Sequence, residues 1–292
     1  MASASSVGRK SASAPSPTRL RQVAFVTKDL ERARYLLTKV LGTEVIFVDP
    51  AVEKWGLKNF LVALGGDIIE VVSPTRQDTT AARLLSKRGD GGYMIIMQTA
   101  DAKGRRDYIE SKGLGKVIFS HENEDFVCVQ YHPKGIKGGM MPELDAHRPT
   151  PENPTPITSR FSHWHACGPD YNSYSAAMKR HSNLHLSGLV CRLEPGDVDH
   201  EGAPRQWEEM FGVARSRDLL AFTNARLGFT RGEEGKPEGL VSITIGVEGV
   251  EYLNGILERA RAEGLCENGW INMLGVKWYF VLAGFGDAKT KL

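Results

Sequence analysis

The chain has 292 residues, of which 41% are hydrophobic and 25% are charged, and its formal net charge is +2. These values are typical of a soluble globular protein that is long enough for two domains. The near balance of charge argues against a basic surface for nucleic acid or an anionic membrane, and no run of about 20 apolar residues is available for a membrane span. The four cysteines lack a C-x-x-C spacing, which indicates a reduced, cytoplasmic protein rather than a zinc cluster or a disulfide framework.

The first eighteen residues differ in composition from the rest of the chain. Residues 1–18 are rich in Ser, Ala and Pro, include Arg9 and Lys10, and contain no acid and no large apolar cluster. Such a composition cannot bury a core, so we expect a disordered tail. An organelle transit peptide remains the alternative, because such peptides are also rich in serine and poor in acids.

From residue 20 onward, strand and helix signals follow one another in a fixed order. A β-branched run at 20–26 predicts a strand, and Asp29 is placed to cap a helix that ends at Gly42. Three strand-like runs follow, at 44–48, 59–64 and 68–72. One unit is therefore a strand, a helix and three strands.

The same order recurs about 70 residues later. A strand at 92–99 and a helix at 102–112 precede three further strands, at 116–120, 126–131 and 139–144. Residues 146–183 contain two proline-rich segments, which predict an extended linker.

A weaker copy of the whole pattern comes after the linker. Its strands are expected at 186–193, 219–222, 225–230, 240–247 and 276–283, and its helices at 204–211 and 250–263. One helix for every three strands argues against a doubly wound parallel sheet, so the expected fold class is α+β.

Three segments carry a resemblance to a known family. They are QVAFVTKDLERA at 22–33, GGYMIIMQT at 91–99 and HPKGIKGG at 132–139. With the recurring βαβββ order, they resemble the vicinal oxygen chelate superfamily, which includes glyoxalase I, extradiol dioxygenases, methylmalonyl-CoA epimerase and the bleomycin-resistance proteins. The resemblance implies paired βαβββ modules that form curved mixed sheets, or glyoxalase-like half-barrels. It also implies two similar domains, at 19–145 and 184–292, with the linker at 146–183 between them.

The resemblance implies four ligand positions on one face of the N-terminal sheet, and these fall on Gln22, Glu70, Met94 and Glu143. Gln22, Glu70 and Glu143 offer oxygen ligands for a hard cation, whereas Met94 replaces the usual histidine with a soft thioether. Three alternatives stay open. A neighbouring histidine replaces the lost ligand, a divalent metal (Mg²⁺, Mn²⁺, Fe²⁺ or Zn²⁺) binds with more water, or the site is metal-free.

Glu70 and Glu143 are also the candidate catalytic carboxylates, because a carboxylate on a buried strand face is costly unless it is satisfied. We expect Glu70→Gln to impair function while stability holds or rises, since the neutral side chain removes the desolvation cost of the charge. His132 precedes Pro133, which keeps its backbone extended, and is a candidate acid or base. Tyr93 and Met94 are candidate substrate contacts.

Two further features are expected to be structural. His163 and His165 flank Trp164 inside the linker, and packing or capping is the expected role for both histidines. The C-terminal half has no carboxylate in the middle of the matching strands, so we expect it to have a structural role or to form a homodimer.

These features together predict a small-molecule enzyme of the vicinal oxygen chelate type. Its chemistry is expected to be that of an isomerase, lyase or hydrolase acting on an oxygenated metabolite, with a carboxylate base. The alternative is a non-catalytic protein that binds or sequesters a small molecule, as the bleomycin-resistance proteins do. Neither nucleic acid nor a membrane is expected as a partner.

Overall fold

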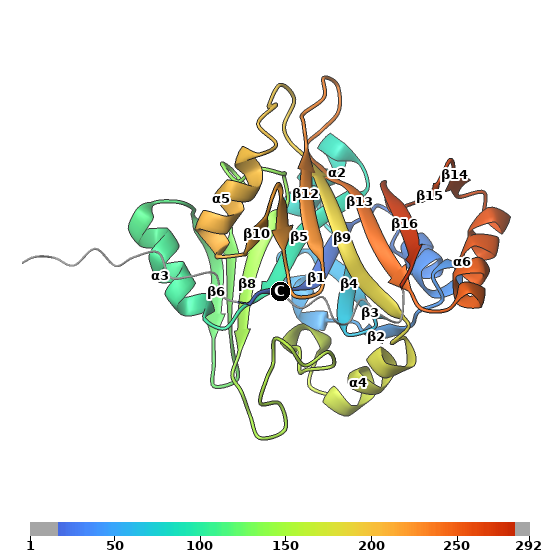
Figure 1. The fold of residues 1–292 in the computed structure, drawn as a ribbon, viewed down its shortest axis with the longest axis horizontal. Helices are drawn as coiled ribbons and strands as arrows, with labels where there is room; N and C mark the ends of the chain where they lie inside the picture. Colours follow the sequence, from blue (N-terminus) through green and yellow to red (C-terminus); the bar gives the residue numbers. More distant parts are fainter. Residues whose placement is uncertain (1–16, 284–292) are drawn as a thin grey trace, which may run out of the picture.

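The computed structural model describes residues 17–283, and two eight-stranded sheets make up most of it (Figure 1). The first sheet contains β1 (Arg19–Val26), β2 (Val45–Phe47), β3 (Leu57–Leu64), β4 (Asp67–Pro74), β5 (Gly91–Gln98), β6 (Val117–Glu122), β7 (Phe126–Tyr131) and β8 (Met141–His147). The second contains β9 (Leu184–Arg192), β10 (Arg215–Ser216), β11 (Leu219–Ala221), β12 (Arg226–Thr230), β13 (Gly239–Val247), β14 (Cys266–Glu267), β15 (Trp270–Met273) and β16 (Val276–Leu282). The tail expected at 1–18 lies outside the described residues, except for its last two.

The helices are α1 (Leu30–Tyr35), α2 (Thr80–Arg88), α3 (Ala102–Lys112), α4 (Tyr171–Arg180), α5 (Gly202–Phe211) and α6 (Val250–Ala262). A π-helical segment, η1 (Leu36–Val40), continues α1, and two 3₁₀ turns are η2 (Pro50–Trp55) and η3 (His165–Cys167). In the described part of the chain, none of these helices has the length and apolar character needed to cross a membrane. The expected α+β class, with two βαβββ modules in each sheet, is confirmed.

The pairing of the strands brings the first and last strands of both modules to the middle of the first sheet. Its order is β2-β3-β4-β1-β5-β8-β7-β6. Strand β1 pairs in parallel with β4 and antiparallel with β5, and β5 pairs in parallel with β8. The second sheet repeats this arrangement as β10-β11-β12-β9-β13-β16-β15-β14. Side chains that are far apart in the sequence, such as those of residues 22 and 143, can therefore meet on the four central strands.

The two faces of the first sheet have different environments. Val23 and Phe25 belong to the main core, which includes residues of both sheets, and the Phe25 ring stacks on Trp278 of β16 with 5.5 Å between centroids. Ala24 points the other way, because side chains alternate along a strand, and it joins a smaller core with Trp164 and Met178 of the linker. We call the face toward the second sheet the inner face and the opposite one the outer face.

The linker is more ordered than its proline content predicted. It contains α4, whose N-cap Asp170 accepts a hydrogen bond from the Ser173 backbone N–H. Tyr174, Ala177 and Met178 are buried at helical spacing on one side of α4, which packs against β2 and β3. The cap and the apolar spacing were present in the sequence, and the neighbouring prolines hid them.

Helix α2 was also missed from the sequence. Thr79 caps it by accepting from the backbone N–H of Ala82, and Ala81, Ala82 and Leu85 are buried. The helix connects β4 to β5 along the chain, and its start borders the cavity described below.

We expect Trp278→Ala to destabilise both sheets, because the indole is fully buried and stacks on Phe25 of the first sheet. Loss of a buried tryptophan costs about 3–5 kcal/mol. Urea unfolding gives the free energy, and hydrogen exchange of the β1 and β16 amides shows where it is lost. Val281→Ala, on the same strand but 46% exposed, is the control. Unchanged protection of β1 in the Trp278 variant would contradict a shared core.

Candidate functional site

A cavity of about 740 Å³ opens on the outer face of the first sheet. Its floor carries Gln22, Glu70, Met94 and Glu143 from the four central strands. One wall is formed by η2 and the start of α2, another by β6 and β7, and residues 165–166 of the linker border a third side. The cavity is therefore built by both modules of the first sheet together with the linker.

Five of the six candidate residues border this cavity. They are Gln22, Glu70, Tyr93, Met94 and Glu143. His132 does not line it: its side chain is exposed, and its Nδ1 accepts a 3.0 Å hydrogen bond from the Lys134 backbone N–H. The histidine caps the turn after β7 instead of extending into the sheet face, so the structure gives it no place as an acid or base here.

A chain of hydrogen bonds converges on Glu70. The indole Nε1 of Trp164 donates to Gln22 Oε1 at 2.7 Å, and Gln22 Nε2 donates to Glu70 Oε2 at 2.8 Å. From the other side, the Asp49 backbone N–H donates to Asn59 Oδ1 at 3.0 Å, and Asn59 Nδ2 donates to Glu70 Oε1 at 2.7 Å. Both carboxylate oxygens of Glu70 are thus acceptors.

The outer members of this chain fix the direction of every bond in it. An indole N–H and a backbone N–H can only donate, so the amides of Gln22 and Asn59 must turn their oxygens outward and their NH₂ groups toward Glu70. Burial raises the pKa of Glu70 to about 7, the two amide donors oppose this rise, and the charge of Glu143 adds to it. The carboxylate therefore changes charge near neutral pH.

Two of the four family ligand positions are engaged in hydrogen bonds in this arrangement. Gln22 Oε1 is engaged by Trp164, and both oxygens of Glu70 accept from amides. Met94 offers only a soft thioether beside these hard oxygen donors. The floor of the cavity is built around a hydrogen-bonded carboxylate.

A second group of polar side chains lies beside Glu143. Cys128 of β7 pairs directly with Asp145 of β8, which places both side chains on one face. With Glu143 and His165 they bring four potential ligand atoms within 4.8 Å of one another. Burial raises the pKa of Glu143, and it raises that of Asp145 well above its ordinary value. A buried group of this composition could hold a metal ion.

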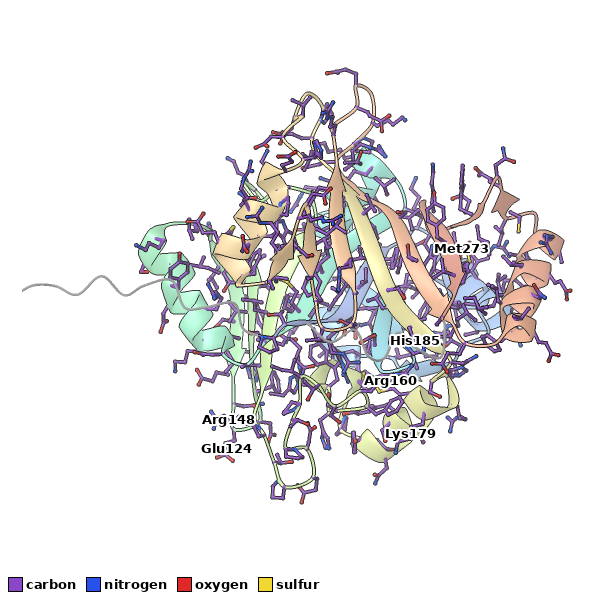
Figure 2. The ribbon with its side chains drawn as sticks, viewed as in Figure 1. Glu124, Arg148, Arg160, Lys179, His185 and Met273 are labelled. Atoms are coloured by element: carbon purple, nitrogen blue, oxygen red, sulfur yellow. The ribbon has the colours of Figure 1, made fainter. Side chains whose placement is uncertain are left out.

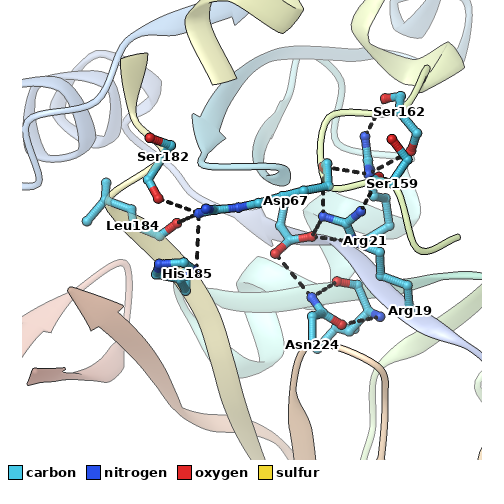
Figure 3. Close-up of polar contacts among 11 residues, drawn as sticks. Arg19, Arg21, Asp67, Ser159, Ser162, Ser182, Leu184, His185 and Asn224 are labelled. Carbon is cyan, nitrogen blue, oxygen red and sulfur yellow. Dashed lines mark hydrogen bonds and ion pairs between the residues drawn. The ribbon is translucent and has the colours of Figure 1, made fainter. Parts of the chain in front are cut away.

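Buried arginines of β1 hold the linker against the first sheet (Figure 3). Arg19 pairs with Asp67 at 2.7 Å and donates to the carbonyl oxygens of Ser159 and Arg160. Arg21 donates to the Ser162 carbonyl at 2.7 Å, and its guanidinium lies over the Trp164 ring. These contacts place the indole next to Gln22.

The linker also approaches the turn between β3 and β4 and the start of the second sheet. A Cβ added to Gly66 would lie 2.0 Å from the Arg160 carbonyl oxygen, so this turn requires glycine. The Arg160 guanidinium contacts the Leu184 carbonyl oxygen and His185 Nδ1, both at 3.1 Å, and Figure 2 shows Arg160 near His185. The linker is thus attached to both sheets.

Several residues of the site were not expected from the sequence. They are Asn59, Cys128, Asp145, Trp164 and His165. Asp145 follows Glu143 by two residues on one strand, so strand alternation could have placed it on the same face. Trp164 and His165 come from the linker, and no pattern in the sequence indicates where the linker lies. His163 has the packing role expected for it, because its ring stacks on Tyr171 at 3.6 Å between centroids.

The structure changes the expectation for Glu70→Gln. A glutamine places an NH₂ group against one of two N–H donors, and an unsatisfied buried donor costs about 1–3 kcal/mol. The wild-type carboxyl has a folded pKa of about 7, above its ordinary value of 4.5. Between these values only the unfolded chain releases the proton, so wild-type stability falls as pH rises.

We therefore expect Glu70→Gln to be less stable than the wild type at pH 5. From pH 5 to pH 8 the free energy of unfolding of the wild type should fall by about 2–3 kcal/mol relative to that of the variant, because the variant has no carboxyl to titrate at this position. Urea unfolding at both pH values measures this, with the exposed Glu124→Gln as control. Parallel pH profiles for wild type and Glu70→Gln would show that Glu70 titrates normally.

Comparison with known proteins bears on the fold alone. No family model matches the chain, and no curated protein matches it either. A hypothetical protein from Staphylococcus aureus is 10% identical and has a TM-score of 0.55, with 91% of this chain and 100% of that one covered.

Two epimerase structures match a little under half of the chain. One is methylmalonyl-CoA epimerase from Streptomyces coelicolor, a single-site variant in complex with 2-nitronate-propionyl-CoA, which is 23% identical to this chain. The match covers 45% of this chain and 99% of that one, with a TM-score of 0.40. The epimerase from Mycobacterium tuberculosis is 21% identical over 47% and 93% of the two chains, with a TM-score of 0.40. Two βαβββ modules in each sheet, with the first and last strands of both modules at the centre, give this chain the fold of the vicinal oxygen chelate superfamily.

Proposed function

We propose that the protein is an isomerase that moves a proton on a small oxygenated carbonyl compound. The observation that supports this most strongly is Glu70, a buried carboxylate on the cavity floor whose pKa is about 7. A general base works best when its pKa lies near the operating pH. Two amides hold the carboxylate in one orientation, so little reorganisation is needed when a substrate arrives.

Tyr93 is the proposed partner of Glu70. It borders the same cavity, and burial raises the pKa of its hydroxyl to about 12, with the charge of Glu70 adding to the rise. The hydroxyl therefore stays protonated and can donate a hydrogen bond to a developing oxyanion.

In the proposed step, Glu70 takes a proton from the carbon next to the substrate carbonyl. The C–H electron pair moves into the enolate, and Tyr93 donates a hydrogen bond to the enolate oxygen. When the enolate turns over in the cavity, Glu70 returns the proton to the opposite face of the same carbon, which gives the epimer and restores the carboxylate.

The walls of the cavity favour a second candidate function, binding without turnover. Trp55, Phe119 and Phe126 line the cavity, and the rings of Trp55 and Phe119 meet edge to face at 5.7 Å between centroids. Aromatic walls of this kind bury the carbon skeleton of a small guest. A sequestering protein needs these walls and has no use for a base with a pKa of about 7.

Proton transfer can be measured as uptake of deuterium from D₂O at the carbon next to the carbonyl. We would screen α-hydroxy ketones, 2-oxo acids and 2-substituted acyl thioesters by proton NMR. With an accepted compound, the rate should rise with pH and level off above about 7, because only the ionised form of Glu70 is a base. Glu70→Gln should lower the rate about 10²–10⁴-fold, and Tyr93→Phe about 10²–10³-fold.

His132→Ala should leave the rate unchanged, because this residue lies outside the cavity. A compound that binds wild type and Glu70→Gln equally well but takes up no deuterium would contradict the isomerase and support the sequestering protein.

A further inference from the structure

We propose that Cys128, Glu143, Asp145 and His165 form a binding site for a transition-metal ion of the Zn²⁺ class. The site lies at the edge of the cavity, where Cys128, Glu143 and His165 border it. Only Glu143 is shared with the ligand positions that the family resemblance implied. The proposal concerns binding of the ion alone and does not depend on the proposed isomerase.

The ligand atoms come from elements that are held independently of any ion. Cys128 and Asp145 face each other in the antiparallel pair of β7 and β8, and Glu143 lies two residues before Asp145 on the same face. His165 is in the linker, where its ring stacks on Phe126 at 3.9 Å between centroids and its Nδ1 lies 3.2 Å from Nε2 of His147. The four atoms lie within 4.8 Å of one another.

The environment of Asp145 gives the main argument for a bound ion. The Asp145 side chain is fully buried, and neither carboxylate oxygen makes a hydrogen bond of normal geometry among the described residues, where Cys128 and Glu143 are the polar groups beside it. Its Oδ2 lies 4.0 Å from Nδ1 of His165. Gln98, its neighbour on β5 in the register, also has an amide without partners. Buried polar atoms are rarely left unpaired in folded proteins, and a bound ion is one way to satisfy them.

The donor set indicates the class of ion. A thiolate and an imidazole favour zinc-like transition metals over Mg²⁺ or Ca²⁺, which prefer oxygen ligands. Bonds of about 2.0–2.3 Å in a tetrahedral site place ligand atoms roughly 3.3–3.8 Å apart. Ligand atoms within 4.8 Å of one another therefore need to close by about 1 Å. The resemblance implied a histidine at position 94, where this chain has Met94. In the proposed site the imidazole comes from His165 of the linker instead.

Metal binding can be tested on the full chain after dialysis against a chelator. Zn²⁺ is added and counted by elemental analysis, and Co²⁺ is added and followed through its thiolate charge-transfer absorption. We expect one Zn²⁺ per chain, a Co²⁺–thiolate band, and no comparable binding of Mg²⁺. Cys128→Ser should abolish the band, and Asp145→Asn and His165→Ala should each weaken Zn²⁺ binding by more than about 100-fold, since loss of even an outer partner costs 10–100-fold.

Matched controls separate this site from other locations. Cys191→Ser, a buried cysteine of the second sheet, and His163→Ala, the neighbouring linker histidine, should keep both Zn²⁺ and the band. Circular dichroism checks that every variant is folded, and His165→Ala, in the linker rather than the core, provides the test if Asp145→Asn does not fold. Absence of stoichiometric Zn²⁺ in the wild type would overturn the proposal, as would a band that survives Cys128→Ser. Binding lost in Glu70→Gln but kept in Cys128→Ser would place the ion at the family position.

Discussion

The site depends on two buried arginines at the start of the chain's first strand. A buried guanidinium is costly unless its N–H groups find acceptors, and the linker supplies carbonyl oxygens to both Arg19 and Arg21. Burial lowers the pKa of Arg21 to about 9, so its charged form relies on the oxygen atoms that the linker supplies. Trp164 and His165 follow directly in the chain, and their positions are set by this attachment. The linker therefore completes a cavity that the sheet alone leaves open.

The second sheet supports the first without duplicating its site. The register places Gly188, Gly228, Ser242 and Tyr279 where the first sheet carries Gln22, Glu70, Met94 and Glu143. None of these four side chains is a carboxylate. Instead, the second sheet covers the inner face of the first, and Asn224 donates a hydrogen bond to Asp67, which also pairs with Arg19. One copy of the fold carries the polar groups, and the other completes the core beneath them.

The sequence predicts the fold well, because each βαβββ module is encoded by local signals. Asp29 caps α1 and glycine ends the predicted helix at residue 113, much as a local reading expects. Gln22, Glu70 and Glu143 could be assigned to one cavity because the resemblance to the vicinal oxygen chelate superfamily implied their positions, and the central strands bring them together. Trp164 and His165 could not, since the position of a linker depends on tertiary contacts that lack periodicity. His132 was misplaced because a residue before proline is extended in a turn as well as in a strand.

The fixed direction of the hydrogen bonds around Glu70 has a consequence for how this site can change in evolution. The side-chain oxygens of Gln22 and Asn59 each accept a hydrogen bond from a group that can only donate. A replacement of Trp164 by a residue without an N–H would free the Gln22 amide to rotate and present its oxygen to Glu70. Substitutions at positions 22 and 164 should therefore occur together among related proteins, although 142 residues separate them. This hydrogen bond thus couples the choice of residue at one position of the linker to the choice at one position of the first strand.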